Sequence, residues 1–173
     1  MTSLLTPDKK AAVILCNLGG PDNEEAIAPF LFNLFNDPAI LSLPQPLRKF
    51  LARFIAQKRA PKAQKIYALL GGKSPLLENT NAQARALESA LQPYGQVRCF
   101  TVMRYWHPMA EEVVEAVKSW GAQQIIFLPL YPQFSTTTTA SSRKEWARAA
   151  KKHGLDVPTA TVCCYPTSAE FIA

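Results

Sequence analysis

The stretch AAVILCNLGGP, residues 11–21, decides the fold of this chain. Residues 11–18 form a short apolar run, which ends in two glycines and a proline. This pattern is typical of a buried strand that leads into a tight turn. A helix is expected after the turn, because Asp22 or Asn23 can cap its first backbone amides.

Outward from this stretch, strand patterns and helix patterns alternate along the sequence. Further strands are expected at residues 97–103, 124–131 and 159–164. Helices are expected at residues 46–60, 77–91, 109–120 and 137–153. Continuously apolar strands that are separated by helices predict a parallel sheet covered on both faces. With no internal repeat or linker, the expected fold class is α/β, a doubly wound parallel sheet in a single domain spanning residues 1–173.

The composition is that of a globular protein. A chain of 173 residues is long enough to close a core, and 48% hydrophobic with 18% charged residues is ordinary. No stretch approaches the roughly 18 uninterrupted apolar residues of a membrane span. Residues 1–10 lack the basic start and apolar run of a secretory signal, so a cytoplasmic location is expected.

The end of the sequence lies within a helix pattern. A helix start is expected at Thr167 and Ser168, and residues 171–173 follow it without a polar tail. We therefore expect the sequence to be part of a longer protein.

The net charge of +6 is concentrated in one block. Residues 46–73 contain eight lysines and arginines and no acidic residue, so the block attracts phosphates, anionic lipid or a polycarboxylate. The helix expected at 46–60 carries an apolar stripe opposite its bases, and the stripe consists of Leu47, Phe50, Leu51, Phe54 and Ile55. This pattern fits two structures equally, an interfacial helix at a membrane surface and an amphipathic helix packed on the domain.

The four cysteines form no C-x-x-C pair. They are Cys16, Cys99, Cys163 and Cys164, and most of them lie in expected strands. Free buried thiols in a reducing compartment are favoured over disulfides or a zinc site.

Three loops follow the expected strands, at residues 17–21, 104–108 and 131–139. Ligands of open α/β sheets bind beyond the carboxyl ends of the strands. These loops supply glycines, aromatic rings, a hydroxyl-rich helix start and Arg104, whose guanidinium can hold a carboxylate by two hydrogen bonds. The set suits a large, flat, aromatic and anionic ligand.

Simpler interpretations of the same residues stay open. The Ser/Thr run can cap a helix, Tyr105 and Trp106 can be core aromatics, and His107 can be a hydrogen-bonded structural residue. His153, at the expected end of the helix at 137–153, can interact favourably with the negative end of that helix dipole. A dinucleotide site is disfavoured because the third glycine of G-x-G-x-x-G is missing, and a P-loop is absent from the sequence.

Four strings in this order resemble the ferrochelatase family along almost the whole chain. They are NLGGP at 17–21, KRAPK at 58–62 with Tyr67 and GGKSP at 71–75, RYWHP at 104–108, and LYPQFS at 130–135 followed by threonines and Ser141-Ser142. The resemblance implies a Rossmann-like domain that forms one of the two similar halves of a class II chelatase. It implies the N-terminal half of a bacterial-type enzyme, with the C-terminal half absent from this sequence.

The resemblance also implies a set of porphyrin-binding residues: Leu18, Arg59, Tyr67, Ser74, Arg104, Tyr105 and Tyr131. Leu18 would face the metal centre of the ring, where it can only shape the pocket because leucine has no donor atom. Arg104 and Tyr105 would lie near the propionates or the ring edge, and Tyr131 near the path of the metal. No catalytic residue and no metal ligand is expected in this chain, because the family's metal-handling histidine and carboxylate lie in the second half.

The activity implied by the resemblance is insertion of ferrous iron into protoporphyrin IX to form protohaem in haem biosynthesis. No cofactor is required, and a [2Fe–2S] cluster is not expected because Thr136 stands where some relatives carry a cysteine ligand. The expected partners are porphyrin and ferrous iron, and no nucleic acid is expected. Peripheral contact at the inner face of the membrane and self-association of this half are further expectations. Two alternatives stay open, a non-catalytic half-length protein that binds porphyrin or haem and a half-chelatase that self-associates.

Overall fold

The computed structural model describes residues 5–172, which fall into two compact units. The sheet unit comprises residues 5–17, 80–104 and 108–172, and the helical unit comprises residues 18–79 and 105–107. That residues 1–173 form a single domain stays a prediction.

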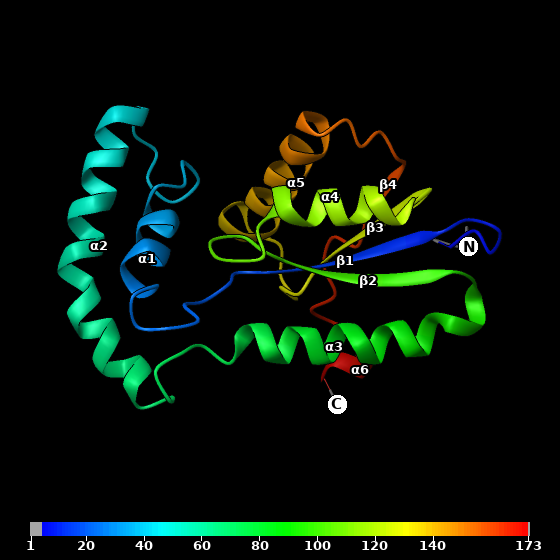
Figure 1. Ribbon diagram of the computed structural model, residues 1–173, viewed down its shortest axis with the longest axis horizontal. Coiled ribbons are helices and arrows are strands. Elements are labelled where there is room, and N and C mark those ends of the chain that lie inside the picture. The colour runs from blue at the N-terminus through cyan, green and yellow to red at the C-terminus, as the bar shows by residue number, and fades with distance from the viewer. Residues whose placement is uncertain (1–4, 173) are drawn as a thin grey trace. The chain divides into compact units, whose positions relative to one another are not determined.

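The sheet unit contains four parallel strands, as the sequence predicts (Figure 1). They are β1 (Ala11–Asn17), β2 (Val97–Met103), β3 (Gln124–Pro129) and β4 (Thr159–Thr161), in the spatial order β2-β1-β3-β4. The chain runs outward in both directions from β1, which is the doubly wound arrangement. The prediction that the last strand reaches residue 164 is wrong, because β4 pairs with β3 only as far as Thr161.

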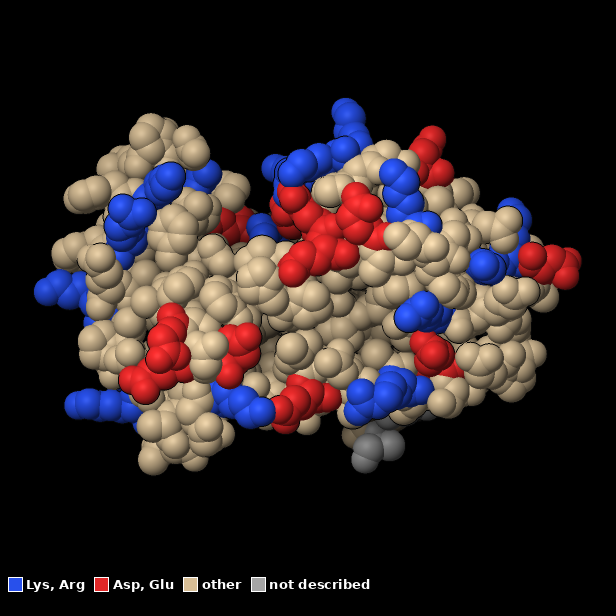
Figure 2. Space-filling model, in the orientation of Figure 1, with Lys and Arg blue, Asp and Glu red and all other residues tan. Residues whose placement is uncertain are grey.

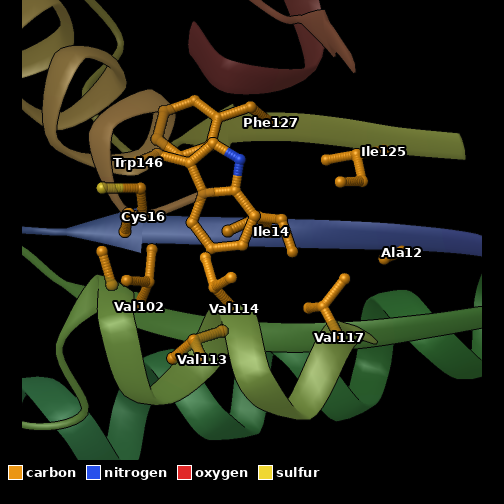
Figure 3. Close-up of a cluster of buried hydrophobic side chains, with 12 residues drawn as sticks. Ala12, Ile14, Cys16, Val102, Val113, Val114, Val117, Ile125, Phe127 and Trp146 are labelled. Carbon is orange, nitrogen blue, oxygen red and sulfur yellow. The ribbon is translucent and has the colours of Figure 1, made fainter. Parts of the chain in front are cut away.

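Helices cover both faces of this sheet. They are α3 (Leu76–Leu91), α4 (Ala110–Trp120), α5 (Ser141–Lys152) and the short α6 (Ala169–Ile172). Side chains of β1 alternate between two apolar clusters. Ile14 and Cys16 pack with Val114 of α4 and Trp146 of α5 (Figure 3). The intervening β1 residues pack with α3 on the opposite face, so β1 is buried on both sides.

An exposed charged network joins α4 to α5, and acidic side chains gather over α4 in Figure 2. Hydrogen bonds from Lys152 at 2.8 Å and from Arg148 at 2.7 Å lower the pKa of Glu111 to about 2. The network therefore stabilises the fold at neutral pH, and this contribution is lost as the pH falls towards 2. His153 caps the C-terminus of α5 and also pairs with Glu115, which extends the dipole role predicted for it.

The helical unit contains α1 (Ile27–Phe35) and α2 (Gln45–Ala68). The predicted end of the second helix at residue 60 is wrong, because the helix continues through Pro61 for two further turns. Pro61 is exposed, so the carbonyl that loses its backbone donor can be solvated.

The long helix α2 buries small residues and exposes large ones. Its buried residues are Ala52, Ala56 and Ala60, one turn apart on the helix. Three members of the predicted apolar stripe are exposed instead, with Leu47 at 52%, Phe50 at 72% and Phe54 at 51%. Alanines on the packed side let α1 and α2 approach closely, while the phenylalanines face outward.

All four cysteines are free thiols, as predicted, but their burial differs. Cys16 is buried and Cys99 is half-buried, whereas Cys163 and Cys164 lie beyond the end of β4 and are exposed. The prediction of burial is therefore wrong for this last pair. No helix within residues 5–172 has the length and apolar character needed to cross a membrane.

Candidate functional site

The carboxyl ends of the three long strands lie at one edge of the sheet unit. Asn17 is in register with Met103, and Cys16 with Pro129. The amide of Arg104 donates to the carbonyl of Asn17 at 2.9 Å, so the chain leaving β2 is fixed beside the end of β1. The sheet therefore brings these strand ends together, as the parallel arrangement predicts.

Arg104 is held at this edge by the start of α5. Its Nε donates to the hydroxyl of Ser141 at 2.9 Å, and the residue is half-buried. Because the side chain is partly oriented by this bond, its guanidinium needs little further ordering to bind a carboxylate. Ser141 is a residue that the sequence identified only as part of a string and not as a partner of Arg104.

Cys16 lies beneath this edge as a buried thiol that stays protonated at neutral pH. Burial raises the pKa of Cys16 to about 12, although a hydrogen bond with Ser142 and the charge of Arg104 oppose the shift. The thiolate is the nucleophilic form of cysteine, so this shift disfavours reaction at Cys16.

The loop after β3 leads into a turn of π-helix, Thr136–Ala140, immediately before α5. Ser135 caps this turn, because its hydroxyl accepts a hydrogen bond from the amide of Thr137 at 3.2 Å. The simpler interpretation of the Ser/Thr run, a helix cap, is therefore confirmed at Ser135. Tyr131 is half-buried in the loop before the cap, and Thr136 is exposed.

In the helical unit, the glycine loop lies against the segment that follows α2. A Cβ added to Gly20 would come within 2.5 Å of the Cβ and Oγ of Ser74 and 4.0 Å of the Tyr67 hydroxyl. The amide of Ser74 also donates to the carbonyl of Pro21 at 2.8 Å. The structure thus brings two predicted porphyrin-binding residues, Tyr67 and Ser74, to the glycine loop that Leu18 begins.

Two glycines turn the chain back after α2. Gly71 and Gly72 have φ values of 84° and 83°, which favour glycine, and the amide of Gly72 donates to the carbonyl of Tyr67 at 2.8 Å. This turn brings Ser74 back to the loop. Burial raises the pKa of Tyr67, so its phenol stays protonated and can donate a hydrogen bond at neutral pH.

Arg59 is not part of this group. It lies eight residues before Tyr67 on α2, about 12 Å along the helix axis. Its guanidinium stacks over the ring of Phe35 at 5.2 Å, which holds the exposed side chain against α1.

Tyr105 is buried, with 1% of its surface exposed. Its hydroxyl donates to the carboxylate of Asp37 at 2.9 Å, and its carbonyl accepts from the Asn33 side chain at 3.1 Å. Its amide donates to the carbonyl of Leu18 at 3.0 Å, so Tyr105 positions the loop that follows β1. Sequence reasoning missed Asp37, which lies 68 residues away and carries no local signal of the pairing.

The neighbours of Tyr105 also fix local structure. Trp106 donates from Nε1 to the carboxylate of Asp22 at 3.0 Å, and its ring lies edge to face with the exposed His107. Within residues 5–172, no group of three His, Cys, Asp or Glu side chains is placed to hold a metal ion.

Comparison with known proteins gives the family. The model of the ferrochelatase family matches residues 10–173. The ferrochelatase of Pelagibacter ubique strain HTCC1062 is 54% identical over 166 residues, which are 94% of this chain and 48% of that protein. The ferrochelatase of Phenylobacterium zucineum strain HLK1 is 54% identical over 162 residues, 92% of this chain and 46% of that protein. That of Caulobacter vibrioides strain NA1000 / CB15N is 50% identical over 167 residues, 95% of this chain and 47% of that protein.

The chain spans about half the length of the curated relatives it matches. The match nevertheless covers nearly all of this chain, including each loop described above. The chain therefore belongs to the ferrochelatase family.

Proposed function

We propose that this chain is the N-terminal, porphyrin-binding half of a ferrochelatase, a lyase that inserts ferrous iron into protoporphyrin IX to form protohaem. The observation that carries the proposal is the family match over residues 10–173 at about half the length of the relatives. The local geometry supports it, because Arg104 is oriented by Ser141 and Gly20 lies directly against Ser74.

The reaction exchanges one ferrous ion for the two protons on the pyrrole nitrogens of the porphyrin. A planar ring directs its nitrogen lone pairs into its own plane, so a pocket that bends the ring exposes them to the metal. Binding energy from the ring edge and the propionates can drive this bending. Arg104 and Arg59 would bind propionates, and Ser74 and the protonated Tyr67 would donate hydrogen bonds. Leu18 and Tyr131 would shape the pocket, and Tyr105 would position the loop that contains Leu18.

Proton acceptance and metal delivery belong to the second half of the protein in this proposal. A proton acceptor must reach the pyrrole nitrogens with a pKa near the working pH. Of the two histidines, His153 pairs with Glu115 across α4 and α5, and His107 is exposed beside Trp106. Iron is a substrate here and no resident cofactor is proposed. Thr136 has a hydroxyl and no thiol at the position where the family resemblance implies a cysteine ligand of a [2Fe–2S] cluster, so no cluster is proposed.

Arg104 provides the test of porphyrin binding. In the complete protein, Arg104→Ala is expected to weaken porphyrin binding about tenfold or more, because one charge-assisted contact to a carboxylate is lost. Fluorescence titration with protoporphyrin measures the affinity. Arg85→Ala is the matched control, since Arg85 is an exposed arginine on α3, and it should leave the affinity unchanged. Equal affinities for the two variants would remove Arg104 from the site.

The outer surface of α2 supports a second element of the proposal, a cytoplasmic location with peripheral contact at the inner face of the membrane. Phe50 and Phe54 are exposed on α2 together with Lys49, Arg53 and Lys58. An apolar strip flanked by lysines and arginines suits an anionic lipid surface, from which a poorly soluble porphyrin would be delivered.

Liposome flotation tests this contact. The complete protein should float with vesicles containing anionic lipid at low salt and dissociate at high salt, because the attraction is partly electrostatic. Phe50→Ser with Phe54→Ser should reduce flotation several-fold, since each exposed ring contributes buried apolar area. The control pair Tyr94→Ser with Leu69→Ser also removes exposed apolar residues and should have less effect. Binding that is indifferent to salt would contradict the electrostatic contribution.

A further inference from the structure

An open groove of about 880 Å³ lies in the sheet unit between α5 and β4. The rings of Phe127 of β3 and Trp146 of α5 form its floor, where they are 0% and 3% exposed and belong to the core of the sheet unit. Ala147, Ala150 and Leu155 extend the apolar lining. The groove contains none of the proposed porphyrin-binding residues, although Ala140, at the end of the turn after β3, belongs to its lining.

The strand order, together with the face on which the connecting helices pack, indicates what kind of element would cover this groove. Helices α4 and α5 carry the crossovers from β2 to β3 and from β3 to β4, and both pack on the same face. A further right-handed crossover in this direction would place its helix beside α5. The described chain takes another path after β4. Val162 packs with the α3 cluster, and the Tyr165 hydroxyl donates to the carbonyl of Pro129 at 3.3 Å. Residues 162–172 therefore leave this side of α5 open.

The charge around the groove indicates the chemistry of the occupant. Arg143, Lys144 and Lys151 line it with a single acidic residue, Asp156. None of the ion pairs formed within residues 5–172 involves these three cations. Three acidic residues of α4 and α5, Glu111, Glu115 and Glu145, are instead paired with Arg148, Lys152 and His153, none of which lines the groove. An occupant with an apolar face and an acidic edge would complement the groove.

We propose that the groove between α5 and β4 is the docking site of an acidic amphipathic helix from the part of the protein beyond residue 173. The relatives are about twice as long as this chain, so they hold roughly as many residues again that can supply it. The inference rests on the proposed function, in which this chain is the first half of a longer enzyme. Docking there would join the second half to the sheet unit without contact to the proposed porphyrin-binding residues, none of which lines the groove.

Protection of a cysteine placed in the groove tests the proposal. Ala147→Cys lies in the groove, and Ala116→Cys on α4 is a matched exposed control. Both are made in the complete protein with Cys163 and Cys164 replaced by serine, because those two thiols are exposed. The other two thiols among the described residues are expected to react slowly, since burial raises the pKa values of Cys16 and Cys99 to about 12, aided at Cys99 by Glu88. Maleimide labelling at position 147 should be at least tenfold slower than at position 116.

A photo-crosslinking residue in place of Lys144 identifies the occupant in the same protein. Crosslinks to peptides beyond residue 173 are expected. Crosslinks to a second copy of the chain, no crosslink beyond residue 173, or equal labelling at positions 147 and 116 would each overturn the proposal. Haem formation is measured in every variant. If the protein forms haem but position 147 is labelled as fast as position 116, the docking site is excluded and the proposed function stands. If position 147 is protected but the protein neither binds porphyrin nor forms haem, the result counts against the proposed function.

Discussion

Replacing Tyr105 with alanine is expected to lower the free energy of unfolding by about 3–5 kcal/mol, the range for removing a large buried aromatic side chain. Tyr105 is 1% exposed, and the substitution would remove both its ring and the hydrogen bond to Asp37. The buried carboxylate would then lose a donor, which adds to the cost of the cavity. Urea denaturation of the complete protein measures the change.

Tyr105→Phe separates the ring from the hydroxyl. Because the ring stays in place, the expected loss is only about 1–3 kcal/mol, the cost of leaving a buried acceptor without its donor. Porphyrin affinity provides the second measurement. A positioning role through Leu18 and Asp37 predicts unchanged affinity in the folded variant. A loss of tenfold or more in the folded variant would instead support the direct porphyrin contact that the family resemblance implies for Tyr105.

The sequence predicts the sheet well because each long strand is apolar on both faces. β1 packs against helices on both sides, so its residues form an uninterrupted apolar run. Such a run predicts a buried strand even when the helices that pack on it are unknown. β2 matches its predicted bounds, and β3 starts where predicted. Residues 162–164 have the same apolar and β-branched character as β4. The amide of Val162 still donates to the carbonyl of Phe127 in β3 at 3.0 Å, but the register of β4 with β3 ends at Thr161, and the end of such pairing is not encoded locally.

The sequence predicts the helical unit less well, for two physical reasons. Pro61 is a helix breaker by local rules, but it is tolerated on the exposed side of α2, where its lost backbone bond can be replaced by water. The apolar stripe on α2 also suggests a buried face. The buried face of α2 instead consists of alanines, because close approach of two helices favours small side chains. A prediction that ranks positions by hydrophobicity gives these alanines less weight than the leucines and phenylalanines and so misplaces the buried face.

The loops of the candidate site were identified from their place after strands, and their partners were not. Ser141 reaches Arg104 from the start of α5, 37 residues along the chain. The contact of Gly20 with Ser74 likewise joins distant segments. Residue type indicates what each side chain can bond, whereas only the folded backbone determines which bonds are made.

Gly20→Ala is expected to lower the free energy of unfolding by about 1–3 kcal/mol, the usual cost of overpacking. The new Cβ would lie 2.5 Å from the Cβ and Oγ of Ser74, so the loop or the segment after α2 must shift. Porphyrin binding should weaken as well, because the shift displaces Ser74 relative to Tyr67. Denaturation and fluorescence titration of the complete protein measure the two effects.

Ser74→Gly provides the control, since it removes both atoms that the new Cβ would meet. Alone, it should cost about 1 kcal/mol, because the Ser74 hydroxyl accepts a hydrogen bond from the amide of Leu76 at 3.2 Å, as a helix cap does. Combined with Gly20→Ala, it should restore most of the stability lost through the clash. The double-mutant cycle should thus show a favourable coupling of about 1–3 kcal/mol. Additive effects would mean that Gly20 is required for a reason other than its contact with Ser74.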